Sequence, residues 1–118
     1  MKKIIKNISA ALLVSSSLLA TSVSMAEESM AEKGNKVAFD RKKGNCLACH
    51  MIPGGELAGN IGPALVAMKA RFPDASVLRA KIYDPRISNP NSSMPPFGAH
   101  NIISAEEIDQ IVEFLYTK

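Results

Sequence analysis

The sequence has no tryptophan, and its aromatic side chains are limited to two tyrosines and four phenylalanines. No stretch alternates apolar and polar residues as half-buried strands do, and no internal repeat is present. These absences exclude a sheet-based domain and a repeat protein. At 118 residues, the chain is predicted to hold one small, nearly all-helical domain, which would gain stability from a large apolar group at its centre.

Apolar runs are also scarce. Only Ile8 to Leu19 is strongly apolar; three lysines precede it, and Ser24-Met25-Ala26 follows as a small-x-small cleavage site. This pattern predicts a secretory signal peptide over residues 1–26 and a mature domain over 27–118. An uncleaved membrane anchor is the alternative, but the run is short for a span of about 20 residues.

The charge balance changes once the exported segment is set aside. The whole chain has 14 basic and 11 acidic residues, and three of the lysines lie in residues 1–26. The mature chain is therefore neutral, so the basic sequence pI gives no support for binding nucleic acid.

Helical periodicity and capping residues place the expected elements. Breaker-rich segments at 52–62 and 87–101 are predicted as long loops, which in so small a domain are usually functional or disordered. The expected helices are 31–43 ending at Gly44-Asn45, 63–71 with Pro63 in first position, 75–83 capped by Asp74, and a last helix with a Ser104/Glu107 capping box that runs to about residue 116.

Cys46-Leu47-Ala48-Cys49-His50 is the C-x-x-C-H pattern of covalent haem attachment. Two intervening residues let one helical turn present both thiols to the vinyl groups along one porphyrin edge. The histidine directly after the second cysteine can then bind the iron from below.

Three other readings compete for these residues. A thioredoxin-like pair needs strands around it, and none is predicted. A zinc site needs four ligands, whereas the mature chain offers only Cys46, Cys49, His50 and His100. A plain disulfide in an exported protein is the third reading, and it leaves His50 without a role.

A second axial ligand is expected on the other side of the iron. Met51 adjoins His50 and cannot reach that side, Met30 lies in a segment expected to fray, and Met68 is expected in the core. Met94 lies in a loop stiffened by Pro95 and Pro96, which could hold its thioether at a fixed place. His100 is the rival ligand, and an exposed loop methionine is the alternative for Met94.

Two further expectations concern the surroundings of the motif. The Pro63 carbonyl is a candidate acceptor for the second imidazole N–H of His50, with simple helix initiation as its alternative. Met51, Ile52, Pro53 and Pro96-Phe97 could form an apolar docking patch at the haem edge, unless they only pack against the ring.

Together, Gly44 to His50, Gly59-Asn60-Ile61-Gly62-Pro63 and Met94-Pro95-Pro96-Phe97-Gly98 resemble the SoxX-type sulfur-oxidation cytochrome c subunit over nearly all of the mature chain. The resemblance implies a class I cytochrome c fold with one covalent haem c and with His50 and Met94 as axial ligands. Pro63 is followed by Ala64-Leu65, where some relatives are expected to carry a second proline, but this departure affects no ligand.

The resemblance also implies a periplasmic heterodimer with a larger SoxA-type cytochrome subunit. Such a complex joins thiosulfate to a cysteine of a sulfur-carrier protein, as an L-cysteine S-thiosulfotransferase. Joining the two removes two electrons, whereas one haem iron stores one, and both cysteines here are consumed by the haem. This chain is therefore expected to be the electron-accepting subunit, without catalytic residues of its own. A free soluble electron carrier and a haem-free disulfide-bonded module are the competing functions.

Overall fold

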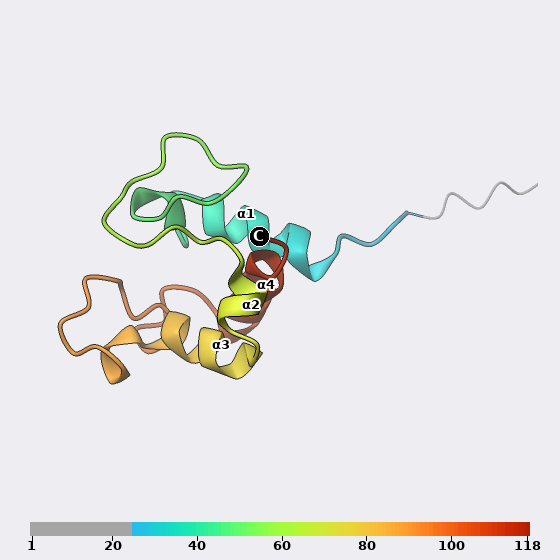
Figure 1. The fold of residues 1–118 in the computed structure, drawn as a ribbon. Coiled ribbons are helices and arrows are strands. Elements are labelled where there is room, and N and C mark those ends of the chain that lie inside the picture. Colours follow the sequence, from blue (N-terminus) through green and yellow to red (C-terminus); the bar gives the residue numbers. More distant parts are fainter. Residues whose placement is uncertain (1–24) are drawn as a thin grey trace, which may run out of the picture.

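Two helices from opposite ends of the domain cross at the centre of the fold in the computed structural model, which describes residues 25–118. The first, α1, spans Met30–Phe39, and the last, α4, spans Ala105–Leu115. Figure 1 shows them packed together although they lie at the two ends of the described chain. The signal peptide predicted for residues 1–26 falls almost wholly outside the described residues.

The crossing depends on one glycine. A Cβ atom at Gly34 would lie only 1.9 Å from the carbonyl oxygen of Gln110, so only a residue without a side chain lets the two backbones approach this closely. Beside this contact, the rings of Phe39 and Phe114 meet edge to face, with centroids 5.5 Å apart. The expected apolar face of α4 is confirmed, since Ile108, Ile111, Val112 and Leu115 are all buried.

Capping residues fix where both helices begin. Ser104 and Glu107 form the predicted capping box of α4. The start of α1 was predicted to fray, and this prediction was wrong. The Ser29 hydroxyl accepts the Glu32 N–H at 3.2 Å, and the Glu32 carboxylate accepts the Ser29 N–H at 2.8 Å, so a second capping box holds this end.

The end of α1 also differs from expectation. The helix ends at Phe39 rather than at Lys43, because the Asp40 carboxylate accepts the Lys42 N–H at 2.8 Å and pulls the backbone into a turn. Residues 41–44 form that turn, and Gly44 donates its N–H back to the Val37 carbonyl at 3.1 Å.

The middle of the domain is mostly irregular. The helix α3, Ala75–Tyr83, is capped by Asp74 as predicted, and it buries Leu78 and Ile82 but leaves Val77 45% exposed. The helix predicted from Pro63 does not form: α2 is only Met68–Arg71, because Ala67 has a positive φ of 50° that interrupts the helical backbone. Short 3-10 turns occupy Cys46–Ala48 and Pro85–Ile87.

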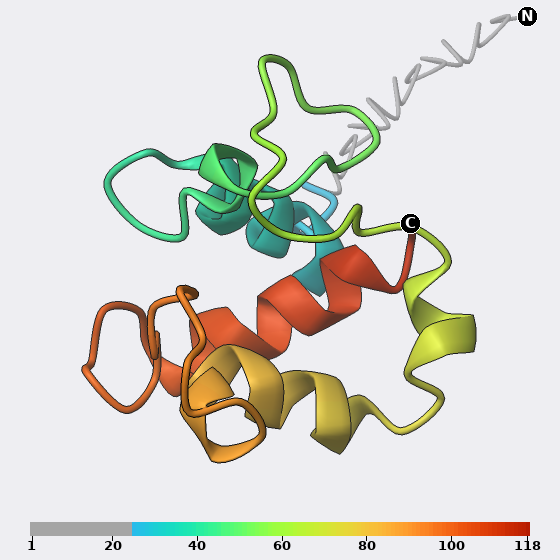
Figure 2. The ribbon, with the colours of Figure 1, turned by 60° about the vertical axis from the view of Figure 1, so that its left-hand side comes forward.

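Residues 25–118 contain no strand, which confirms the expected all-helical class. Within that range no helix is both long and apolar enough to span a bilayer. Figure 2 shows the stretch that follows α1, in green, on one side of α4, and the stretch that follows α3, in orange, on the other. The two long loops predicted from the sequence therefore lie on either side of one central helix.

Candidate functional site

A cavity of about 730 Å³ lies between these two loop regions. Its walls are mainly apolar, and α4 contributes Ile111 and Leu115 while α3 contributes Leu78 and Ile82. This volume is within the range of about 300–1,000 Å³ that is typical of cofactor and ligand sites. All five sequence-predicted site residues line this cavity. Cys46, Cys49, His50 and Pro63 come from the region after α1, and Met94 comes from the loop after α3.

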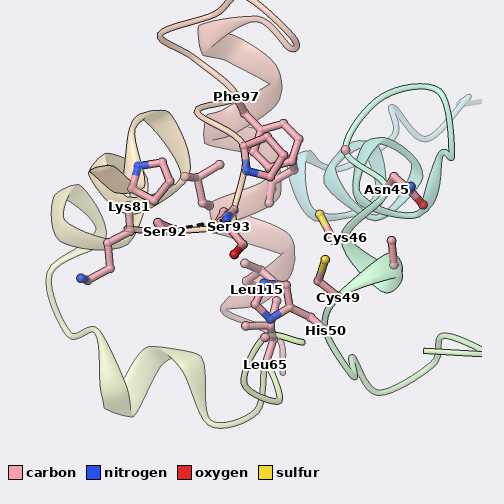
Figure 3. Close-up of a pocket in the computed structure, with 18 of the residues that line it drawn as sticks. Asn45, Cys46, Cys49, His50, Leu65, Lys81, Ser92, Ser93, Phe97 and Leu115 are labelled. Carbon is pink, nitrogen blue, oxygen red and sulfur yellow. Dashed lines mark hydrogen bonds between the residues drawn. The ribbon is translucent and has the colours of Figure 1, made fainter. Parts of the chain in front are cut away.

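The attachment motif forms a single tight turn. His50 donates its backbone N–H to the Cys46 carbonyl at 2.9 Å, and the Cys49 N–H reaches the same oxygen at 3.2 Å. Both thiols are free and half-buried, and Figure 3 shows both sulfur atoms pointing from the motif into the cavity. The expectation that one helical turn presents both sulfurs to the same edge agrees with this geometry.

Burial controls the state of the first thiol. It raises the pKa of Cys46 to about 11, because the thiolate would lose its hydration there. At neutral pH the Cys46 side chain is therefore an uncharged thiol in an apolar wall, which is compatible with an apolar occupant.

Gly62 and Pro63, which are consecutive in the chain, fix the orientation of the His50 ring. Its Nδ1 atom lies 2.7 Å from the Pro63 carbonyl oxygen. A carbonyl can only accept, so Nδ1 carries the proton and the lone pair of Nε2 is free to bind a metal. Because 63–67 is not helical, helix initiation cannot be the role of Pro63.

Gly62 makes room for that ring. A Cβ atom at Gly62 would lie 2.3 Å from His50 Cε1 and 2.6 Å from Nδ1. The Gly62 N–H also bonds the Cys49 carbonyl at 2.8 Å, so the loop is tied directly to the motif. The imidazole is thus clamped by backbone rather than by another side chain.

Arg71 holds the rest of this loop in place. Its guanidinium donates to the Ala64 carbonyl at 2.9 Å and to the Val66 carbonyl at 3.3 Å. This role of Arg71 could not be predicted from the sequence, because it depends on a loop conformation that the local pattern does not encode.

Met94 lines the cavity from the loop after α3 and is half-buried. Its backbone N–H bonds the Ser92 hydroxyl at 3.2 Å. Further along, Gly98 and Ala99 both donate to the Tyr83 carbonyl, at 3.0 and 3.1 Å, and anchor the loop to the end of α3. These bonds, together with the prolines, fix the segment that carries the thioether.

The other candidate axial ligands, His100 and Met68, have different surroundings from Met94. His100 is exposed and does not line the cavity; its Nε2 atom lies 3.4 Å from an Arg86 nitrogen. Met68 is buried at 1% exposure and touches the cavity as part of the core. Among residues 25–118, no cluster of three or more His, Cys, Asp or Glu side chains is arranged to hold a metal ion, which gives no support to the zinc alternative.

The expected apolar patch was wrong in two of its members. Ile52 is 1% exposed and Phe97 is 7% exposed, because both side chains pack into the core. Met51 and Pro53 are exposed as expected, and Leu57 and Ile61 are further exposed apolar side chains near the motif.

These residues fit a haem. The cavity supplies an apolar slot, two thiols on one edge, an imidazole nitrogen on one wall and a thioether on another. A helical fold built from crossed terminal helices around such a slot defines a class I cytochrome c.

Comparison with known proteins agrees with this class. The family model described as "Cytochrome C oxidase, cbb3-type, subunit III" matches residues 29–115, and the chain belongs to that family. The crystal structure of SoxXA from P. pantotrophus matches with a TM-score of 0.66 and 26% identity, over 74% of this chain and 80% of that chain. Together these matches support a SoxX-type class I cytochrome c, a haem protein of electron transfer.

A curated relative extends beyond this domain. An "Uncharacterized lipoprotein" of Aquifex aeolicus (strain VF5) is 41% identical over 76 residues, which is 64% of this chain. The matched region spans only 37% of that relative's length, so the relative carries a further region that this comparison does not cover.

Proposed function

We propose that this chain is a periplasmic, mono-haem c-type cytochrome that accepts electrons within a thiosulfate-oxidising complex. The observation that carries the proposal is the convergence of His50 and Met94 on one apolar cavity edged by Cys46 and Cys49. When bound there, haem supplies a reversible one-electron change at its iron.

Each site residue has a distinct task in this proposal. Cys46 and Cys49 would attach the porphyrin through two thioether bonds, and before attachment burial keeps the Cys46 thiol neutral in the apolar wall. His50 binds the iron through Nε2, since Nδ1 is committed to Pro63. Met94 provides the opposite ligand, and a Met/His pair raises the reduction potential, which suits an electron acceptor.

The accepting role follows from electron balance. Oxidative joining of thiosulfate to a carrier-protein cysteine releases two electrons, and one haem iron takes one. Both cysteines of the sequence are assigned to the haem, so no thiol is left for sulfur chemistry. The sulfur-handling site and a second redox centre must then belong to a partner, which we assign as a larger SoxA-type cytochrome subunit because SoxXA is a structural relative.

The contact with that subunit is assigned to the loop after the motif. Leu57 is 92% exposed and Ile61 is 74% exposed, and Glu56 is the only charged residue between Met51 and Pro63. Stable interfaces between subunits bury apolar cores of this kind.

The test is co-expression of this chain with a SoxA-type subunit in a host that attaches haem. We expect co-purification, an absorption spectrum of low-spin haem, and a mass increase on this chain equal to one haem. Leu57→Asp, at a site that does not line the cavity, should abolish co-purification, whereas Ile87→Asp, at a site 82% exposed in the other loop, should leave it intact. A haem-loaded chain that never associates would instead indicate a free carrier, and a colourless chain would refute the haem site.

A further inference from the structure

The loop that contains Met94 closes on itself at the end of α3. The last carbonyls of a helix have no partner within the helix. The Tyr83 carbonyl is satisfied instead by the N–H groups of Gly98 and Ala99, at 3.0 and 3.1 Å. Residues 84–97 therefore lie between two points of the chain that touch, as in a compact Ω-loop.

Between these two points the loop is bonded mainly to itself. Among the hydrogen bonds of residues 25–118, those made by 89–96 all have their partners within 85–100. At the outer limits of that range, the Asn89 N–H bonds the Pro85 carbonyl at 3.0 Å, and the Pro96 carbonyl accepts the His100 N–H at 3.0 Å. The place of the Met94 thioether in the cavity therefore depends on how the ends of the loop are held.

The Tyr83 side chain adds a second contact at the closure. A Cβ atom at Gly98 would lie 2.0 Å from Cδ2 and 2.7 Å from Cγ of the Tyr83 ring, so the ring fills the space where a side chain at position 98 would lie. Gly98 is buried, and its neighbour Phe97 belongs to the core at 7% exposure, whereas Tyr83 is 40% exposed. The closure is thus held between a surface ring and a core ring.

Tyr83 does not itself reach the site. It is not among the residues that line the cavity, so its ring does not touch the thioether of Met94 across that space. Any effect of the ring on Met94 must pass through the backbone of Gly98 and the loop that ends there. The contact involves Cγ, Cδ2 and Cε2 of the ring, so the hydroxyl is not needed for it.

We propose that Tyr83 is a positioning residue for Met94. Its carbonyl and its ring hold the loop closed, and the closed loop presents the thioether at a fixed place. The inference rests on the proposed function, in which Met94 binds the iron. A thioether is a soft ligand and suits reduced iron better than oxidised iron, so a loosened loop should release the oxidised iron first.

The test measures how readily added imidazole displaces Met94 from the oxidised, haem-loaded protein. Imidazole can take the position of Met94 only when the loop opens, so its apparent affinity reports the open fraction. Tyr83→Ala removes the ring, Tyr83→Phe keeps it, and Gly98→Ala places a methyl group against it. Val77→Ala is the matched control, because Val77 is 45% exposed on the same helix. Urea unfolding of each variant measures its stability separately.

We expect Tyr83→Ala and Gly98→Ala each to raise the imidazole affinity about fivefold to tenfold, the effect of one lost packing contact. Both should also weaken the sulfur–iron absorption band of the oxidised protein, whereas Tyr83→Phe and Val77→Ala should keep the wild-type values. Gly98→Ala should add nothing to Tyr83→Ala, because the methyl group then enters the space that the ring has left.

An unchanged imidazole affinity in Tyr83→Ala, an equal rise in Val77→Ala, or additive effects of the two loop variants would overturn the inference. If Tyr83→Ala gave no haem-loaded protein, Gly98→Ala alone would decide by the same readout. A wild-type protein without a sulfur–iron band would refute Met94 as a ligand and this inference with it, which differs from a failure confined to Tyr83. None of these readouts requires a SoxA-type subunit, so the result is independent of the thiosulfate role.

Discussion

The imidazole Nδ1 of His50 lies 2.7 Å from the carbonyl oxygen of Pro63, across a separation of 13 residues. The loop between them carries the exposed apolar residues assigned to a partner contact, and its last residues orient the ring. A change in that loop can therefore reach the iron through one hydrogen bond, because the acceptor strengthens the imidazole as a ligand.

Gly62→Ala should displace the His50 ring, since the added Cβ would lie 2.3 Å from Cε1 and 2.6 Å from Nδ1. We expect a large fall in the yield of haem-loaded protein and a high-spin component in the spectrum of what remains. Asn60→Ala, exposed in the same loop, is the matched control and should have a normal spectrum. A normal spectrum for Gly62→Ala as well would mean that the ring is free to shift.

Met94→Leu should remove the second axial ligand while preserving an apolar side chain of similar size. The potential should fall, because a thioether ligand raises it, and the reduced iron should become able to bind carbon monoxide. Met68→Leu and His100→Ala should change neither property. If His100→Ala alone opened the iron to carbon monoxide, the assignment of Met94 would be wrong.

Gly34→Val should destabilise the fold by about 3 kcal/mol, at the upper end of the usual overpacking cost, because the helix crossing has no space at Gln110. Urea unfolding of the haem-loaded protein measures this change. Asn35→Ala, the next residue of α1, should shift the midpoint much less. Equal midpoints for the two variants would show that α1 and α4 can separate at no cost.

Glu107 should make stability depend on pH. Its pKa is lowered from 4.5, first by Lys43 and then by the Ser104 N–H, so its stabilisation is present above that value and is lost as pH falls through the lowered pKa. Glu107→Gln should therefore cost about 1 kcal/mol at pH 7 and progressively less in acid. Glu113→Gln on an exposed position of the same helix should show no such trend in urea unfolding measured between pH 3 and 7.

The sequence predicted those parts of the fold that depend on short-range contacts. The Ser104/Glu107 box, the Asp74 cap and the apolar face of α4 were all correct. The end of α1 was misplaced because the Asp40 side chain competes with the helix, and the segment from Pro63 was misread because Ala67 adopts a positive φ.

The site was predictable in its residues but not in its surroundings. Spacing alone pointed to Cys46, Cys49 and His50, and the proline-rich loop pointed to Met94. Arg41, Lys42 and Lys43 were expected within the first helix, whereas the structure places them in a turn beside the cavity. Likewise, Phe97 was expected at the surface but is 7% exposed, because the loop folds its ring inward.

The crossing of α1 and α4 has a consequence for how the protein matures. The hydrogen bonds that shape the turn from Cys46 to His50 close within five residues, whereas the α4 wall of the cavity comes from Ala105–Leu115, far along the chain. The turn that carries the two thiols and His50 can therefore form before α4 packs beside it and closes the cavity. A chain truncated before Ala105 would keep the motif but lose Ile111 and Leu115 from the cavity wall. A haem attached to such a chain would stay open to solvent on that side.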